Sequence, residues 1–243
     1  MRSIERFYDL LSYNTIDIWR NQVFNLGRDF GYEKTLLAIF PDCNSPMEAE
    51  YAFLHSSYSV EWRNKYDELK LGHLDPTVSH CLIHSTPLIW TPEIFSARRQ
   101  KEMYEEACGY GLKSGVTLPI HGARGELGIL CFVNDVKPSV NFKRHAIHSF
   151  SELSCFRDFI FESALKFIND ARPKKEFTHI TNRELECLKW SAAGKSSWEI
   201  GELLHCTEAT VNFHFSNIRR KLNSRSRQQA IVRAISLGLI NPS

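Results

Sequence analysis

The sequence predicts an α+β protein with two domains: an N-terminal α/β/α sandwich around a central antiparallel sheet, and a C-terminal four-helix domain. Apolar runs rich in β-branched residues alternate with helical patterns through most of the 243 residues, but the last 66 contain only short helical patterns. The charge also changes along the chain. Residues 1–171 hold 18 Lys and Arg against 22 Asp and Glu, and residues 172–243 hold 12 against 6. An acidic domain is therefore joined to a basic one, and only the basic one needs an anionic partner.

The first domain, residues 1–169, begins and ends with a long helical pattern. Apolar periodicity predicts helices over 4–26, 59–70, 76–84, 92–109 and 141–168, and strands over 35–40, 51–54, 115–121 and 127–134. Because the short strands lie between long helices, we expect one sheet covered by helices on both faces. Residues 121–125 (His-Gly-Ala-Arg-Gly) have the composition of a tight hairpin between the last two strands.

A linker over residues 170–177, which is polar, charged and contains Pro173, precedes the second domain, residues 178–243. Thr181 with Glu184, and Ser196 with Glu199, form two capping boxes that mark helix starts. Together with further N-cap and glycine signals, they predict helices near 182–193, 197–204, 208–222 and 227–237. The second and third of these helices are separated only by 205–207, which is the spacing of a helix-turn-helix.

The predicted helix 208–222 has one apolar face and one polar, basic face. Its core stripe recurs at helical spacing and consists of Val211, Phe215, Ile218 and Leu222. The opposite face carries side chains that can contact base edges, and no acidic residue follows Glu208. Five cations within nine residues indicate phosphate contact: Arg219, Arg220, Lys221, Arg225 and Arg227. The alternative interpretation is a small helical bundle with a solvated basic face.

The chain lacks the sequence patterns of a membrane protein, a secreted protein or an enzyme. Its N-terminus has no signal-peptide core, and no apolar run is long enough to span a membrane. The seven cysteines are odd in number and form no CxxC pair, which predicts reduced thiols in a cytoplasmic protein. His80 and His84 stand four residues apart, but no third ligand or HExxH motif accompanies them. We therefore expect no catalysis, no metal and no cofactor.

The unusual residues of the first domain are aromatic. Tyr58, Trp62 and Tyr66 are spaced i, i+4, i+8 on one face of a predicted helix, and Asp75 and Trp90 follow them. A plain core stripe, with Asp75 as a helix N-cap, would give the same pattern. Most of these side chains carry polar groups, however, which a dry core would have to satisfy. We therefore expect them to surround a cavity for an apolar ligand with amide and carbonyl groups.

Nine positions in both domains match the spacing of one known family. They are Trp62, Tyr66, Asp75, Pro76, Trp90, Gly115, Glu184, Leu188 and Gly194. The stretches GKSSWEIG, TVNFH and IRRKL of the helix-turn-helix agree with them. In these features the chain resembles the LuxR-type quorum-sensing transcription factors over essentially its full length. The resemblance implies an N-acyl-homoserine lactone ligand, a homodimer, a double-stranded promoter site, and RNA polymerase as a further partner.

The resemblance also implies a role for each matching residue of the cavity. Trp62 would donate its indole N–H to the lactone carbonyl, Asp75 would accept the ligand amide N–H, and Tyr58 would bond the amide carbonyl. Gly115 would be structural. The remaining head-group contacts would come from Tyr66, Trp90, Phe95 and Leu112.

Two positions depart from the pattern of the family members that the chain most resembles. Cys131 stands where a serine or threonine usually helps to bind the amide carbonyl, and a thiol is a weaker donor. Ala38 replaces a glycine that lines the cavity. Both changes leave the acyl-chain length and 3-position substitution open, and we expect the thiol at Cys131 to favour medium-to-long acyl chains. The residues expected to contact DNA are Lys195, Thr210, Asn212, Phe213, His214, Ser216, Asn217, Arg219 and Arg220.

Two other functions remain open at this point. A phosphorylation-controlled response regulator shares this kind of DNA-binding domain, but the strand 35–40 leads only to Asp42 and follows a long helix. The second is a DNA-binding regulator whose first domain is only a protein-interaction module.

Overall fold

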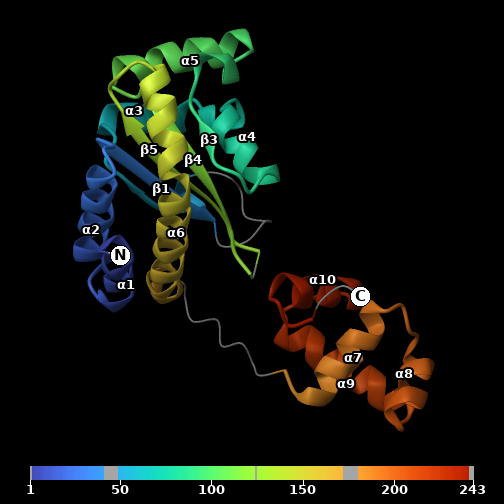
Figure 1. Cartoon of the computed structure of the whole chain (residues 1–243). Helices are drawn as coiled ribbons and strands as arrows, with labels where there is room; N and C mark the ends of the chain where they lie inside the picture. Colours follow the sequence, from blue (N-terminus) through green and yellow to red (C-terminus); the bar gives the residue numbers. More distant parts are fainter. Residues whose placement is uncertain (1, 41–48, 124, 172–179, 241–243) are drawn as a thin grey trace. The chain divides into compact units, whose positions relative to one another are not determined.

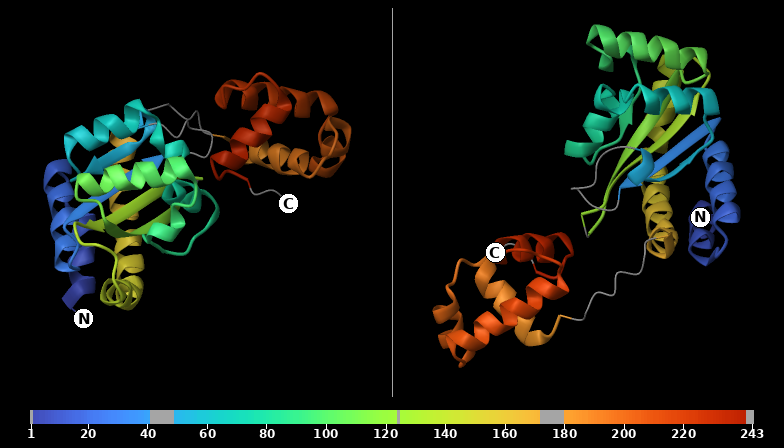
Figure 2. Two further views of the ribbon diagram at one scale, coloured as in Figure 1. Left: turned by 90° about the horizontal axis from the view of Figure 1, so that it is seen from above. Right: turned by 180° about the vertical axis from the view of Figure 1, so that it is seen from behind.

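The computed structural model describes residues 2–40, 49–123, 125–171 and 180–240. The chain divides into two compact units, and the division falls after helix α6 (Val140–Ala171). The N-terminal unit is a sheet between two layers of helices and the C-terminal unit is helical (Figures 1 and 2), so the predicted fold class is confirmed. None of the helices in these four ranges is both long and apolar enough to cross a membrane.

One face of the sheet is covered by α1 (Arg2–Ser12), α2 (Ile16–Asp29) and α6. The sequence pattern predicts a single helix over 4–26, and this prediction is wrong, because the chain breaks before Ile16 at an extended Thr15. Threonine and asparagine side chains compete for backbone hydrogen bonds, so Asn14 and Thr15 disfavour a helix interior. The break allows α1 to pack against α6 while α2 packs against β1 (Lys34–Phe40). Because α6 continues to Ala171, the first two residues of the predicted linker are helical, and its remainder lies outside the described residues.

The described residues form an antiparallel sheet with the order β2-β1-β5-β4-β3 (Figure 1). Its other strands are β2 (Phe53–Ser56), β3 (Leu88–Ile89), β4 (Ser114–His121) and β5 (Leu127–Asn134). The predicted β4–β5 hairpin is confirmed, and the backbone N–H of Gly122 closes it on the Glu126 carbonyl at 2.8 Å. β2 starts two residues later than predicted, because the 3₁₀ turn η1 (Ala49–Tyr51) precedes it. β3 was not predicted, since two residues are too short to show alternation.

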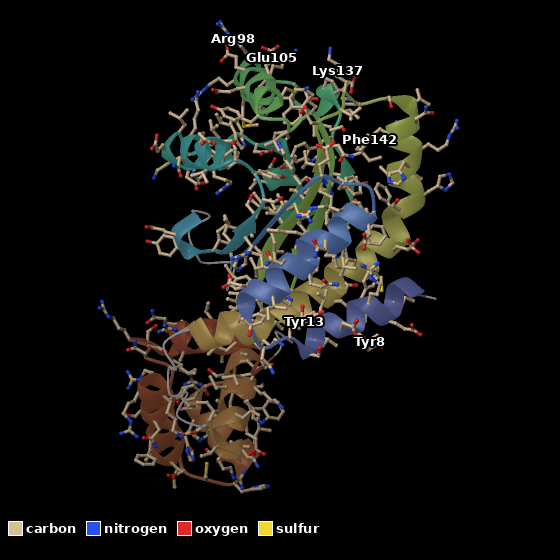
Figure 3. All side chains as sticks on the ribbon, turned by 90° about the vertical axis from the view of Figure 1, so that its left-hand side faces the viewer. Tyr8, Tyr13, Arg98, Glu105, Lys137 and Phe142 are labelled. Atoms are coloured by element: carbon tan, nitrogen blue, oxygen red, sulfur yellow. The ribbon has the colours of Figure 1, made fainter. Side chains whose placement is uncertain are left out.

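The other face of the sheet is covered by shorter helices (Figure 2). These are α3 (Val60–Glu68), η2 (Leu71–His73), α4 (Pro76–Ile83), η3 (Pro92–Ile94) and α5 (Arg98–Gly109). The predicted helix 92–109 is therefore divided into a 3₁₀ turn and α5. Arg98 and Glu105 of α5 point away from the sheet (Figure 3), whereas Met103 and Ala107 are buried.

Side chains of the central strands alternate between two hydrophobic clusters, one on each face of the sheet. On β1, Leu37 and Ile39 belong to the cluster under α1, α2 and α6, while Leu36 and Ala38 belong to the cluster under α3–α5. On β5, the second cluster receives Ile129, Cys131 and Val133. The alternation predicted for these three residues is therefore confirmed.

The C-terminal unit consists of α7 (Asn182–Ala192), α8 (Ser197–Leu204), α9 (Glu208–Lys221) and α10 (Arg227–Ser236), within one residue of the predicted bounds. Both predicted capping boxes are present, at the N-termini of α7 and α8. A Cβ atom on Gly201 would lie 2.7 Å from the carbonyl oxygen of Cys206, so only glycine allows the α8–α9 turn to fold back this closely. This turn fixes the direction in which α9 leaves α8.

Candidate functional site

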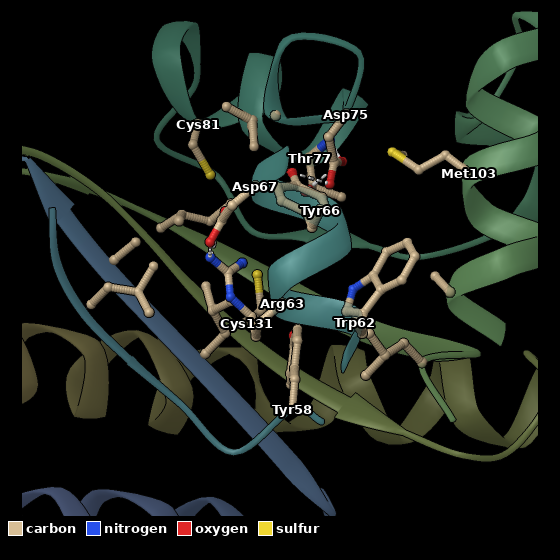
Figure 4. Close-up of a pocket in the computed structure, with 18 of the residues that line it drawn as sticks. Tyr58, Trp62, Arg63, Tyr66, Asp67, Asp75, Thr77, Cys81, Met103 and Cys131 are labelled. Atoms are coloured by element: carbon tan, nitrogen blue, oxygen red, sulfur yellow. Dashed lines mark hydrogen bonds and ion pairs between the residues drawn. The ribbon is translucent and has the colours of Figure 1, made fainter. Parts of the chain in front are cut away.

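The hydrophobic cluster under α3–α5 encloses a cavity of about 120 Å³ (Figure 4). All nine predicted ligand-binding residues line it: Ala38, Tyr58, Trp62, Tyr66, Asp75, Trp90, Phe95, Leu112 and Cys131. They come from strands β1 and β5, from α3 and the segment before it, and from the N-cap of α4. The others lie in the segments on either side of η3 and just before β4. The topology therefore brings together in one cavity residues that lie far apart in the sequence.

The carboxylate of Asp75 lines the cavity and accepts several hydrogen bonds. Asp75 is the N-cap of α4, and its Oδ1 accepts hydrogen bonds from the Thr77 backbone N–H at 2.8 Å and the Thr77 hydroxyl at 2.7 Å. Its Oδ2 accepts from the Tyr66 hydroxyl at 2.9 Å. Burial raises the pKa of Asp75 above its ordinary value, although the hydrogen bonds from Thr77 and Tyr66 oppose the rise. Asp75 is thus the N-cap of α4, as the alternative interpretation of the sequence predicted, and it also lines the cavity.

Two further polar groups of the cavity have no partner of their own. The Tyr58 hydroxyl is buried and makes no hydrogen bond within the described residues. Trp62 is only 3% exposed, and its indole N–H donates no hydrogen bond within the described residues. Trp62 instead packs its ring against Tyr66 and Tyr110. An unpaired buried hydroxyl costs free energy, so Tyr58 indicates where a polar ligand would bond, and the Trp62 indole N–H is a second available donor.

Two polar contacts through Thr117 connect Trp90 to Cys131. The indole N–H of Trp90 donates to Thr117 Oγ1 at 2.7 Å, and this oxygen lies 3.3 Å from the Cys131 thiol sulfur. Burial raises the pKa of Cys131 to about 12, so the group is a neutral thiol. Gly115 makes the arrangement possible, because a Cβ atom there would lie 3.1 Å from the Trp90 ring and 2.8 Å from a backbone oxygen.

Sequence reasoning missed several residues that line the cavity. Arg63 is the least expected, since a charged residue next to Trp62 fits a solvated helix face; its ion pair with Asp67 (2.8 Å), four residues later, was a signal in the sequence. Thr77 follows the Asp-Pro pair directly, and its role as donor to an N-cap could have been inferred. Met103 and Cys81 gave no such signal, because apolar residues at core spacing look alike in any buried element. Thr117, which accepts the hydrogen bond from the Trp90 indole, gave none either.

On α9 the structure places the predicted DNA-contacting residues away from the core. The stripe Val211, Phe215, Ile218 and Leu222 is buried, whereas Phe213 is 64% exposed. Asn212, Ser216, Arg219 and Arg220 are exposed on the same helix, and Thr210, His214 and Asn217 are half-buried beside them. Lys195 is exposed in the turn before α8, where it pairs with Glu199.

Two of the five cations predicted to contact phosphate have structural partners. Lys221 donates to the Glu184 carboxylate at 2.7 Å, and that carboxylate, which also caps α7, is buried. Arg227 bonds the hydroxyls of Ser191 and Ser197. The sequence does not show which basic side chains face a buried acid or hydroxyl, so these two partners were not predicted, and phosphate contact by the five cations stays a prediction.

An apolar cavity with a few polar groups in one unit and a helix-turn-helix in the other is the arrangement expected of a ligand-responsive transcriptional regulator. Residues 15–164 match the family model of the autoinducer binding domain, and residues 178–234 match that of the bacterial regulatory proteins of the luxR family. The chain belongs to this LuxR family of quorum-sensing regulators.

Relatives match along most of the chain. The transcriptional activator protein VanR of Vibrio anguillarum is 31% identical over 242 residues, which cover 100% of this chain and 98% of VanR. The transcriptional activator protein LuxR of Aliivibrio fischeri (strain ATCC 700601 / ES114) is 34% identical over 189 residues, covering 76% of this chain and 74% of LuxR. Among solved structures, SdiA in complex with octanoyl-rac-glycerol has a TM-score of 0.76 at 20% identity, over 96% of this chain and 93% of that chain. This last likeness shows that the fold is shared.

Proposed function

We propose that this protein binds an N-acyl-homoserine lactone in the cavity under α3–α5 and, as a dimer, activates transcription at a promoter site. The observation that carries the proposal is the set of polar groups in an otherwise apolar cavity: the buried and unpaired Tyr58 hydroxyl, the Trp62 indole N–H, and the Asp75 carboxylate, which accepts from Thr77 and Tyr66. An acyl-homoserine lactone offers a lactone carbonyl, an amide carbonyl, an amide N–H and an apolar chain. The two sets of groups complement each other.

The head group is assigned by the family resemblance, and the donor and acceptor types of the residues agree with it. Trp62, which can only donate, would bond the lactone carbonyl through its indole N–H. Asp75 has one oxygen fixed by Thr77 and the other shared with Tyr66, and the shared oxygen accepts the ligand amide N–H. The Tyr58 hydroxyl donates to the amide carbonyl. Tyr66, Trp90, Phe95 and Leu112 then enclose the ring.

The acyl chain lies against the apolar remainder of the cavity. Ala38 and Ile129 face it from adjacent strands, where they are paired in register, and Cys131 stands two residues further along β5. Each buried methylene contributes about 0.8 kcal/mol. With a thiol at Cys131 in place of a hydroxyl, the site depends more on chain burial than on amide polarity. It therefore favours medium-to-long acyl chains.

The C-terminal unit supplies the DNA contacts. α9 enters the major groove with Asn212, Phe213 and Ser216 toward the bases, and Lys195, Arg219 and Arg220 bind phosphate. Thr210, His214 and Asn217 adjoin this surface. A dimer presents two such helices about 34 Å apart, which matches successive major grooves. The protein acts in the cytoplasm, where chromosomal DNA and RNA polymerase are its partners, and it has no catalytic role. VanR and LuxR, which are named activators, support activation over repression.

Titration with lactones of four to twelve acyl carbons tests the proposal. Binding to the folded state alone raises the free energy of unfolding by about 2.7 kcal/mol at one hundred times the dissociation constant. We expect the unfolding temperature of the N-terminal unit to rise with lactone concentration, and fatty acids of the same lengths to have a smaller effect. No shift with any lactone would contradict the proposal and favour a first domain that serves only protein interaction or phosphorylation control.

A further inference from the structure

Asn212, on the exposed side of α9, is held by the neighbouring helix through its side-chain oxygen. Ser197, the first residue of α8, donates its hydroxyl hydrogen to Asn212 Oδ1 at 2.7 Å. The two hydrogens of the Asn212 amide have no partner within the described part of the chain. The Asn212 side chain is therefore left with two available N–H donors.

The direction of this hydrogen bond is fixed by Arg227. One guanidinium nitrogen of Arg227 (Nη1) donates to Ser197 Oγ at 2.8 Å, and a guanidinium has no acceptor. The Ser197 oxygen must therefore accept from Arg227, and its single hydrogen goes to Asn212. If the Asn212 amide turned over, Ser197 would face donors on both sides and its own hydrogen would lose its acceptor. The chain of hydrogen bonds thus runs from Arg227 through Ser197 to Asn212.

Arg227 is itself held from three further directions. Its Nε donates to Ser191 Oγ at 2.7 Å, and its Nη2 donates to the Lys195 carbonyl at 3.1 Å. Its guanidinium carbon lies 4.1 Å from the centroid of the Phe215 ring, on the buried side of α9. The cation therefore cannot leave Ser197 without breaking contacts to α7, the turn before α8, and α9. This fixes the orientation of the Asn212 amide before DNA is bound.

We propose that Asn212 is a specificity-determining residue that reads a hydrogen-bond acceptor on a base edge, and that it selects guanine. In the major groove, guanine presents two adjacent acceptors, N7 and O6, which suit an outward amide N–H₂ group. A bidentate contact with adenine needs the amide oxygen and nitrogen together. Here adenine would have to share that oxygen with Ser197 or take it away. The inference rests on the proposed DNA-binding role of α9 and narrows it to one class of base edge.

The test selects bound DNA from duplexes with randomised half-sites, using the full chain with the lactone that most raises its unfolding temperature. The wild-type protein is expected to enrich guanine at one position of each half-site. Asn212→Ala, which removes the donors without adding a charge, should reduce that preference about tenfold or more. Ser197→Ala should admit adenine at the same position, because the amide is then free to turn.

Ser191→Ala is the matched control. It also removes a serine hydroxyl bonded by Arg227, but this hydroxyl has no link to Asn212, so base preference should stay as in the wild type. Enrichment of adenine by the wild type at the position that depends on Asn212 would overturn the inference. So would a loss of affinity in Asn212→Ala that is equal on all sequences, since the donor would then bond phosphate, or identical preferences in the two serine variants. Absence of lactone-dependent DNA binding by the wild type would instead count against the proposed function.

Discussion

Tyr58 and Tyr32 are buried tyrosines whose hydroxyls have no hydrogen-bond partner within the described residues, and they belong to opposite faces of the sheet. Tyr58 lines the cavity, whereas Tyr32 packs against Phe132 and Phe142 under α6. Burial raises the pKa of both hydroxyls well above the ordinary value. An unpaired buried hydroxyl costs roughly 1–3 kcal/mol. Only Tyr58 is placed to recover this cost when a ligand binds.

The two tyrosines give a matched test of the ligand contact. Tyr58→Phe should weaken lactone binding by about 1 kcal/mol, because one hydrogen bond to the amide carbonyl is lost. Tyr32→Phe makes the same chemical change away from the cavity and should leave the affinity unchanged. Neither should lower the free energy of unfolding of the ligand-free protein. Titration calorimetry and urea unfolding measure both quantities, and equal affinities for Tyr58→Phe and the wild type would remove Tyr58 from the site.

If Asp75 accepts the ligand amide N–H as proposed, lactone affinity should depend on pH in a direction that follows from the raised pKa of Asp75. Burial raises the pKa of Asp75 in the free protein, and a ligand N–H bonded to the carboxylate lowers it again in the complex. Lactone affinity should therefore be highest, and independent of pH, above the pKa that Asp75 has in the free protein. As the pH falls through that pKa, affinity should fall by up to about tenfold per pH unit, and it should level off below the pKa of the complex.

Asp75→Asn is the variant that isolates this effect. It should bind lactone more weakly by about 1.5–3 kcal/mol near neutral pH, and its affinity should not vary with pH in the acidic range. Trp62→Phe should lose a similar amount of binding while keeping the pH dependence of the wild type. A pH profile for Asp75→Asn that follows the wild type would show that another group titrates.

Cys131 and Cys81 are both buried thiols on the cavity wall. Comparing their serine variants separates the effect of a hydroxyl at the proposed amide contact from the effect of a hydroxyl elsewhere in the cavity. Cys131→Ser should tighten binding of most lactones by about 1 kcal/mol, because a hydroxyl is a better donor than a thiol. In the same variant, the advantage of long chains over four-carbon chains should become smaller. Cys81→Ser should not tighten binding. Looser binding in Cys131→Ser, measured by competition across chain lengths, would contradict the assignment.

Among the elements, the sequence predicted best those that start at a polar cap or alternate over many residues. The capping boxes at Thr181 and Ser196, and the alternation on β5, are local patterns that the tertiary structure does not override. The break at Thr15, the two-residue strand β3 and the division of helix 92–109 depend on packing that no short window contains. The same holds for the cavity: Tyr58 and Trp62 were recognisable, whereas Thr117 depends on the cross-strand register of β4 and β5.

Within the C-terminal unit, Lys221 and Arg219 are cations of α9 that should respond differently to substitution. Lys221→Ala leaves the buried Glu184 carboxylate without its cation and should lower the free energy of unfolding by about 3 kcal/mol. Arg219→Ala should leave stability near that of the wild type. It should instead weaken binding to all DNA sequences and reduce the slope of log affinity against log salt by about 1.

Urea unfolding and salt titrations of the two variants provide the comparison. If Lys221→Ala were as stable as Arg219→Ala, the ion pair would not hold α9 against α7. An unchanged salt slope in Arg219→Ala would remove Arg219 from the phosphate-contacting residues.

For the whole molecule, the proposed function divides ligand sensing and DNA contact between the two units, and it requires a dimer so that two copies of α9 read one site. The dimer can be tested by changing the spacing between the two half-sites relative to the helical repeat of DNA. Inserting half a turn, about 5 base pairs, between the half-sites should abolish lactone-dependent binding, since the second α9 would meet the wrong side of the duplex. A full-turn insertion should restore part of it. Gel-shift assays that show equal affinity for all three spacings would indicate a monomer on DNA.

The alternation of side chains along β1 and β5 also affects how such a receptor can diversify. On β1, Leu37 and Ile39 belong to the cluster that holds α1, α2 and α6 against the sheet, while Leu36 and Ala38 face the ligand cavity. Within these two strands, the proposed ligand contacts therefore fall on every second residue, and the residues between them hold the opposite face. Substitutions at Ala38 or Cys131 should thus change the accepted ligand without loosening the helices packed on the other side of the sheet.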